Sequence, residues 1–216
     1  MKMSEIKAIL FDMDGVLVDS ETPLMKCAID HLKAKYTIAV KFEDFADFVG
    51  KGEDAAIGGV VRKNGGTYLP QMKDECYEIY IQLAETIVEA APGMKELLPK
   101  LKEKCKLAVA SSADRRKVDV NIRVLGVEES VFDAVITGSD ITNKKPDPEI
   151  YIKAAKAVGV SPENCLVVED AVAGIEAGKA AGCMVVGVTG SFDAQTLKKA
   201  GADYIVETTK DIEKLI

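Results

Sequence analysis

The chain has 216 residues, a length that suits one domain or a main domain with a smaller insert. Hydrophobic residues make up 48% of it and charged residues 29%, enough for a packed core under a polar surface. The net charge of −7 argues against general nucleic-acid binding, because contacts to phosphates need a basic surface. No apolar run approaches the length of a membrane span, and acidic residues interrupt the first apolar run, which is not typical of a signal peptide.

The five cysteines are scattered and form no Cys-x-x-Cys pair, which indicates reduced thiols in a cytoplasmic protein. The single histidine, His31, falls in a predicted helix. We therefore expect neither a histidine-dependent catalytic triad nor a zinc site with several histidines, so that any chemistry comes from Asp, Ser and Lys side chains. Nothing in the sequence implies a protein partner, and we expect a monomer.

Short apolar strands alternate with helical patterns along most of the chain. The predicted strands are Ile6–Phe11, Lys106–Ser111, Ala134–Thr137, Cys165–Val168, Met184–Val188 and Tyr204–Val206. The predicted helices are Asp114–Leu125, Pro148–Val158, Ala171–Ala181, Ala194–Ala200 and Thr209–Leu215. This alternation is typical of βαβ units and predicts an α/β fold with a mostly parallel sheet.

Residues 19–90 interrupt the alternation, since they contain helical patterns and no clear strand. These helical stretches are Pro23–Lys35, Phe42–Phe48, Asp54–Lys63 and Gln71–Ala90. A connection of this length is typical of an inserted domain rather than a loop. Ala91, Pro92 and Gly93 then mark the return to the main domain. We predict a core of residues 1–18 and 91–216 and an inserted helical domain of residues 19–90.

Polar side chains lie at or just after the ends of four predicted strands. They are Asp12 and Asp14, Ser111 and Ser112, Lys144 and Lys145, and Glu169 and Asp170. Because parallel strands open their carboxyl ends on one edge of the sheet, we expect these residues to converge. Clustered acids repel one another unless a cation binds, and carboxylate oxygens favour Mg²⁺. A phosphoryl group held by the metal, a lysine, a hydroxyl and backbone N–H groups would complete the site.

Each of these pairs also has a simpler interpretation when it is taken alone. The two aspartates could form a polar turn, the serines could cap the following helix, and the lysines could lie in a solvated turn. Four such pairs at strand ends favour one shared site instead. Arg115 and Arg116 either reach a bound phosphate or lie exposed on their helix.

Four segments resemble the motifs of the haloacid dehalogenase superfamily, in order and in spacing. They are DMDGV at 12–16, ASS at 110–112, KKPDP at 144–148 and VVEDAVAGIEAG at 167–178. The similarity covers essentially the whole chain. It implies a three-layer Rossmann-like core with a helical cap inserted after the first motif. That arrangement is similar to the subgroup of β-phosphoglucomutase and many sugar-phosphate phosphatases.

The resemblance also implies roles for the motif residues. Asp12 would be the nucleophile that forms an aspartyl-phosphate, and Asp14 would protonate the leaving group and later activate water. Lys145 would neutralise the phosphoryl group, and Ser111 would hydrogen-bond it, with Ser112 and Gly15 beside it.

The implied metal ligands are Asp12, the backbone carbonyl of Asp14, and Asp170, with Glu169 acting through water. In the cap loop, Lys51 and Glu53 are the implied residues for substrate selection. The implied cofactor is Mg²⁺.

The resemblance implies a phosphatase of a small phosphorylated metabolite, such as a sugar phosphate. One alternative is a phosphosugar mutase, which would pass the phosphoryl group to a sugar. β-Phosphoglucomutases usually carry a histidine in the stretch that matches residues 21–25, where this chain has Leu24. A second alternative is a phosphoacceptor or binding module similar to a receiver domain, which the long insert and the DxDG spacing disfavour.

Overall fold

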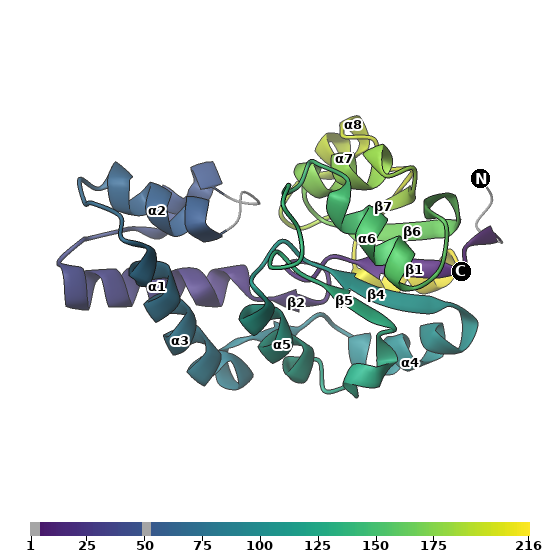
Figure 1. The fold of residues 1–216 in the computed structure, drawn as a ribbon, viewed down its shortest axis with the longest axis horizontal. Helices are drawn as coiled ribbons and strands as arrows, with labels where there is room; N and C mark the ends of the chain where they lie inside the picture. The colour runs from purple at the N-terminus through teal and green to yellow at the C-terminus, as the bar shows by residue number, and fades with distance from the viewer. Residues whose placement is uncertain (1–4, 49–52) are drawn as a thin grey trace. The chain divides into compact units, whose positions relative to one another are not determined.

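The computed structural model describes residues 5–48 and 53–216. It divides into two compact units, one of Met1–Asp19 with Glu89–Ile216 and one of Ser20–Val88. The first unit contains the main sheet, and the second is helical (Figure 1).

A six-stranded parallel sheet forms the centre of the first unit, with strand order β5-β4-β1-β6-β7-β8. The strands are β1 (Ala8–Phe11), β4 (Lys106–Ala110), β5 (Ala134–Ile136), β6 (Cys165–Glu169), β7 (Met184–Val188) and β8 (Tyr204–Val206). The α/β fold predicted from the sequence is confirmed, and every predicted strand is present. Four of the six strands are apolar and buried at nearly every position, which is typical of a parallel sheet covered on both faces.

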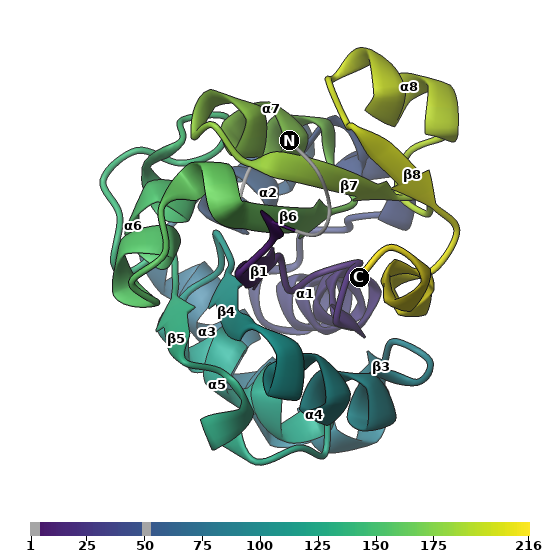
Figure 2. The ribbon, with the colours of Figure 1, turned by 90° about the vertical axis from the view of Figure 1, so that its right-hand side faces the viewer.

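Helices cover both faces of this sheet (Figure 2). On one face lie α6 (Glu149–Ala157), α7 (Val172–Ala180) and α8 (Ala194–Lys199), and on the other lie α4 (Met94–Lys104) and α5 (Arg115–Val124). Short 3₁₀ helices complete the unit, namely η3 (Glu129–Val131), η4 (Pro162–Asn164) and η5 (Thr209–Lys214). Leu10, Ala108, Ile150 and Ile175 are fully buried in the core between the sheet and its first helical face.

Two elements of this unit differ from the prediction. Helix α4 was not predicted, although Met94, Leu97, Leu98 and Leu101 have helical spacing and are buried. Pro99 lies inside this helix, and proline ordinarily disfavours a helix interior, so local propensity does not indicate a helix here. The helix predicted after residue 208 is the 3₁₀ helix η5 rather than an α-helix.

Two short strands flank the helical unit, which corrects the expectation that residues 19–90 hold none. Strand β2 (Val18–Asp19) pairs antiparallel with β3 (Glu89–Ala90). The predicted helix that ran to residue 90 therefore ends earlier. The two connections between the units are joined to each other by this ladder.

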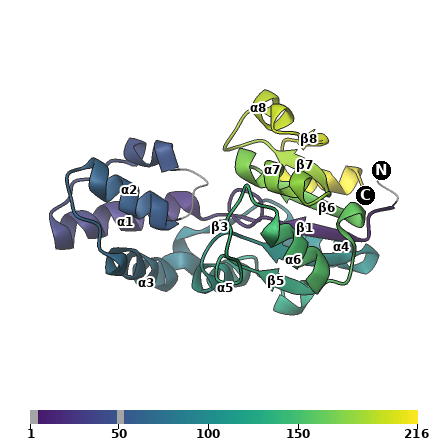
Figure 3. The same cartoon turned by 45° about the horizontal axis from the view of Figure 1, so that its top comes forward.

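The second unit contains α1 (Glu21–Tyr36), η2 (Phe42–Phe48), α2 (Glu53–Lys63) and α3 (Pro70–Ile87) (Figure 3). Its core includes Leu32, Phe45, Ile57 and Val60. Glu75 on α3 joins α1, because its carboxylate lies 2.7 Å from His31 Nε2 and accepts hydrogen bonds from Lys35 and Tyr36. None of the described helices is long and apolar enough to cross a membrane.

Candidate active site

The loop that follows β1 carries Asp12 and Asp14 and is fixed by bonds to distant parts of the chain. The N–H of Asp12 donates to the carbonyl of Val168 on β6 at 3.0 Å. The buried hydroxyl of Thr209 donates to the carbonyl of Val16 at 2.6 Å. Sequence reasoning missed Thr209, because a threonine at the start of a predicted C-terminal helix gives no sign of a distant partner. These bonds hold the loop at the carboxyl end of β1.

Two glycines allow the acids to approach the backbone closely. Gly15 has φ +74°, and a Cβ built on it would lie 2.1 Å from Oδ2 of Asp170. A Cβ on Gly174 of α7 would lie 1.6 Å from Oε1 of Glu169. A Cβ at either position would displace a carboxylate, so glycine at both positions lets the acids lie where they do.

Lys145 joins the ends of three strands. Its Nζ lies 2.6 Å from Oδ1 of Asp12, 2.6 Å from Oε1 of Glu169 and 3.2 Å from the carbonyl of Ala110. The side chain of Lys145 is only 7% exposed, whereas Lys144 is exposed to solvent. Of the two neighbouring lysines, it is therefore Lys145 that turns into the acidic cluster.

Glu169 is held at both carboxylate oxygens. Oε1 accepts from Lys145 and from the hydroxyl of Tyr151, the latter at 3.0 Å, and Oε2 accepts from the N–H of Ala171 at 2.9 Å. The Lys145 ammonium also lies 4.9 Å from the centre of the Tyr151 ring. Sequence reasoning missed Tyr151, because an aromatic residue on the apolar face of α6 reads as core.

Asp12, Glu169 and Asp170 are all buried and offer carboxylate oxygens within 4.8 Å of one another. Asp170 also accepts a short hydrogen bond from the hydroxyl of Ser191, another residue that sequence reasoning missed. When ionised, these three acids carry three negative charges, which Lys145 offsets only in part. Hard oxygen donors with excess negative charge fit a divalent cation such as Mg²⁺.

The electrostatics of Asp12 also favour a bound cation. Burial raises the pKa of Asp12 to about 8, with Glu169 and Asp14 adding to the rise and Lys145 opposing it. Burial lowers the pKa of the Lys145 ammonium, but the negative charges of Asp12 and Glu169 outweigh this effect and raise the pKa well above its usual value. A divalent cation beside Asp12 would favour its ionised form, which is the form able to act as a nucleophile.

Ser111 and Ser112 lie at the carboxyl end of β4, beside the same edge of the sheet. Ser111 is 1% exposed, and its hydroxyl oxygen accepts from the N–H of Ala113 at 3.2 Å. The hydroxyl of Ser112 is buried and has no hydrogen-bond partner among the described residues. A buried hydroxyl without a partner is unfavourable, so Ser112 has capacity for a ligand oxygen.

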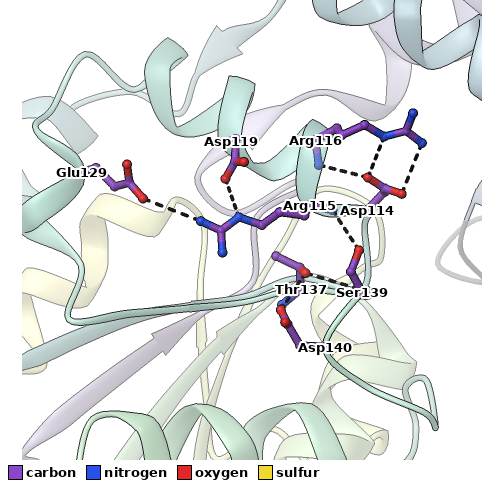
Figure 4. Close-up of polar contacts among 8 residues, drawn as sticks. All are labelled: Asp114, Arg115, Arg116, Asp119, Glu129, Thr137, Ser139 and Asp140. Carbon is purple, nitrogen blue, oxygen red and sulfur yellow. Dashed lines mark hydrogen bonds and ion pairs between the residues drawn. The ribbon is translucent and has the colours of Figure 1, made fainter.

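The Arg115 and Arg116 side chains are held by neighbouring carboxylates (Figure 4). Arg115 Nε lies 2.6 Å from Asp119, and its guanidinium extends toward Glu129. Arg116 Nε and its backbone N–H both donate to Asp114, the residue that caps α5. These contacts agree with the interpretation of both arginines as exposed helix residues. The helix cap is Asp114 rather than either serine.

Two predicted substrate-selecting residues receive no test from the structure. Lys51 lies outside the described residues. Glu53 begins α2, and its side chain lies outside the described part of the chain.

Lys117 is a further charged residue at this edge that sequence reasoning missed. Its Nζ lies 2.7 Å from Oδ1 of Asp14, and its side chain is 1% exposed. A lysine in a largely polar helical stretch is ordinarily assigned to the surface, and no motif marks this one.

Comparison with known proteins shows the family of this chain. The profile of the family described as haloacid dehalogenase-like hydrolase matches residues 9–188. The protein SUPPRESSOR OF QUENCHING 1, chloroplastic, of Arabidopsis thaliana is 38% identical over 93% of this chain, which spans only 19% of that protein. The phosphorylated carbohydrates phosphatase of Thermotoga maritima is 32% identical over 94% of both chains.

Solved structures agree with this assignment. The crystal structure of CbbY from Rhodobacter sphaeroides in complex with phosphate superposes with a TM-score of 0.85 at 25% identity, covering 96% of both chains. The chain therefore belongs to the haloacid dehalogenase-like hydrolases.

Proposed function

We propose that this protein is a Mg²⁺-dependent phosphatase that hydrolyses a small phosphorylated metabolite through an aspartyl-phosphate on Asp12. The observation that carries the proposal is the position of Lys145, which contacts Asp12 and Glu169 at 2.6 Å each, with Asp170 beside them. This arrangement supports a nucleophilic role for Asp12, with Lys145 as its counter-charge and with buried carboxylates beside it that could hold a metal.

In the first step, a carboxylate oxygen of Asp12 attacks the phosphorus of the substrate. A bond forms between that oxygen and phosphorus while the bond from phosphorus to the leaving oxygen breaks. The electron pair of the broken bond stays on the leaving oxygen, which takes a proton from Asp14. The ammonium of Lys145 offsets the negative charge on the phosphoryl oxygens, and the hydroxyls of Ser111 and Ser112 donate hydrogen bonds to those oxygens.

In the second step, the aspartyl-phosphate is hydrolysed. Asp14, now ionised, removes a proton from a water molecule as the water oxygen attacks phosphorus. The bond between phosphorus and Asp12 breaks, inorganic phosphate leaves, and Asp12 returns as a carboxylate. Asp14 is again protonated, so the cycle closes with one water consumed.

The metal, when bound, supplies positive charge that favours ionised Asp12 and offsets the charge of the phosphoryl group. Asp12, Asp170 and the backbone carbonyl of Asp14 are the groups we assign to it. Both carboxylate oxygens of Glu169 already accept hydrogen bonds, so we assign Glu169 mainly to holding Lys145 and to contacting the metal through water.

The substrate we propose is a phosphorylated carbohydrate or a similar small phosphate monoester. Support comes from the relatives, since the Thermotoga maritima protein is named a phosphorylated carbohydrates phosphatase and CbbY binds phosphate in its crystal. Leu24, in place of the histidine expected of a mutase, favours hydrolysis over transfer to a second sugar.

The test is a screen of phosphate monoesters with the wild-type protein and two asparagine variants. Asp12→Asn removes the nucleophile, and Asp119→Asn removes a carboxylate that is 42% exposed on α5. We expect Mg²⁺-dependent release of phosphate from wild type and Asp119→Asn, and none from Asp12→Asn. Full hydrolysis by Asp12→Asn would refute the proposal.

The same screen separates the alternatives. Interconversion of glucose 1-phosphate and glucose 6-phosphate with added bisphosphate, without net hydrolysis, would indicate a mutase. A phosphorylated form that persists for hours without turnover would indicate a phosphoacceptor.

A further inference from the structure

Lys117 is a buried lysine whose ammonium contacts the carboxylate of Asp14. The distance between Nζ and Oδ1 is 2.7 Å, and the exposed fractions of the two side chains are 1% and 16%. The two residues are 103 positions apart in the chain, so the contact is made by the fold rather than by local sequence.

Lys117 is buried, whereas the two basic residues before it on α5 are exposed. Arg115 and Arg116 are 46% exposed and paired to acids at the surface. Lys117, the next residue, turns inward to the face of the helix that buries Val118 and Asn121. Burying an ammonium group is unfavourable unless a partner compensates it, and the Asp14 carboxylate is such a partner here.

The contact restricts Asp14 at the point where the proposed chemistry needs it. Asp14 lies on a loop, and an aspartate side chain there can adopt several rotamers. The Lys117 ammonium, which is held on a helix and contacts Oδ1, favours one of these rotamers of Asp14. Proton transfer requires a donor within hydrogen-bond reach of the leaving oxygen, so a carboxylate held in one orientation transfers its proton more often.

We propose that Lys117 is a positioning residue that holds the Asp14 carboxylate where it exchanges protons with the leaving oxygen and with water. The inference rests on the proposed phosphatase function, because it assigns to Asp14 the proton transfers of that reaction. Lys117 acts through Asp14 and is distinct from Lys145, which contacts Asp12.

The test compares two substrates that differ in their need for a proton. Phenyl phosphate has a basic leaving oxygen that requires protonation, whereas 2,4-dinitrophenyl phosphate has a leaving group that departs without it. The quantity to measure is kcat/KM, which covers the reaction up to formation of the phosphoenzyme and so excludes the water step. The full chain is assayed with Mg²⁺ as wild type, Lys117→Met, Lys117→Arg and the control Lys179→Met.

Lys179 is a matched control because it also forms an ion pair, with Asp203 at 2.8 Å, at the amino-terminal edge of the sheet. We expect Lys117→Met to lower kcat/KM for phenyl phosphate about 10- to 100-fold, because a small misplacement of a catalytic group causes a loss of this magnitude. For 2,4-dinitrophenyl phosphate we expect little change. We expect Lys117→Arg, which keeps the charge, to recover part of the loss, and Lys179→Met to leave both substrates unchanged.

Equal losses on both substrates, or no loss on either, would overturn the inference, since a purely structural role affects both alike. If Lys117→Met fails to fold, as judged by circular dichroism, the same comparison is made with Lys117→Gln. Asp12→Asn tests the proposed function separately, because it should abolish turnover of both substrates whatever Lys117 does.

Discussion

Replacing Gly15 with alanine would test whether close approach of the DxDG loop to Asp170 shapes the proposed metal site. Gly15 has φ +74°, a conformation that costs a residue with a Cβ about 1–2 kcal/mol. The new Cβ would also lie 2.1 Å from Oδ2 of Asp170, well inside van der Waals contact. Asp170 would have to move by about 1 Å or more, away from the other acids.

Gly159→Ala is the matched control, because Gly159 has φ +70° and open space around the position of a Cβ. We expect Gly159→Ala to lower the free energy of unfolding, measured in urea, only by the cost of the backbone conformation. Gly15→Ala should lose an additional 1–3 kcal/mol, roughly the cost of overpacking a filled site.

The same pair of variants should differ in metal binding. Thermal unfolding followed across a Mg²⁺ titration should show affinity reduced about 10- to 100-fold in Gly15→Ala and unchanged in Gly159→Ala. Equal stability losses and equal Mg²⁺ affinities in the two variants would refute the argument that Gly15 makes room for Asp170.

Three further predictions concern groups around the same edge of the sheet. Thr209→Val removes the hydrogen bond to the carbonyl of Val16 and should lower the free energy of unfolding by about 1–3 kcal/mol, measured in urea. Tyr151→Phe keeps the ring but removes the hydrogen bond to Glu169, and it should cost about 1.5–3 kcal/mol in the same measurement. Because the pKa of Asp12 is raised to about 8 in the folded protein, its contribution to stability is present below its ordinary value near 4 and is lost as the pH rises through 8. Metal-free wild type should therefore lose stability relative to Asp12→Asn as the pH rises from about 4 to 8, and parallel pH profiles would contradict this sign.

The sheet was predictable because its strands are buried on both faces. Continuous apolar runs such as Ala8–Phe11, separated along the chain by helical patterns, are typical of parallel strands covered by helices. The meeting of Asp12, Lys145 and Glu169 also followed from topology, since parallel strands bring their carboxyl ends to one edge.

The supporting residues of the site could not be predicted in the same way. Lys117 and Tyr151 lie on helices, where a lysine is ordinarily expected at the surface and an aromatic residue in the core. Thr209 and Ser191 act on residues far away in the chain, and only the packed structure shows which partner each hydroxyl reaches. Helix α4 contains Pro99, so local propensity disfavours a helix there, and burial of four apolar side chains with helical spacing stabilises it instead.

In the proposed reaction, Asp12 carries the phosphoryl group and Asp14 releases it to water. The most direct measurement uses Asp14→Asn with Mg²⁺ and 2,4-dinitrophenyl phosphate, whose leaving group needs no proton. The reaction is quenched in acid, and the phosphorylated peptide is identified by mass spectrometry. We predict phosphate on Asp12, removed by hydroxylamine as an acyl phosphate is, at a higher level than in wild type. Release of dinitrophenol with no phosphate on the protein, or with phosphate on another residue, would contradict the account.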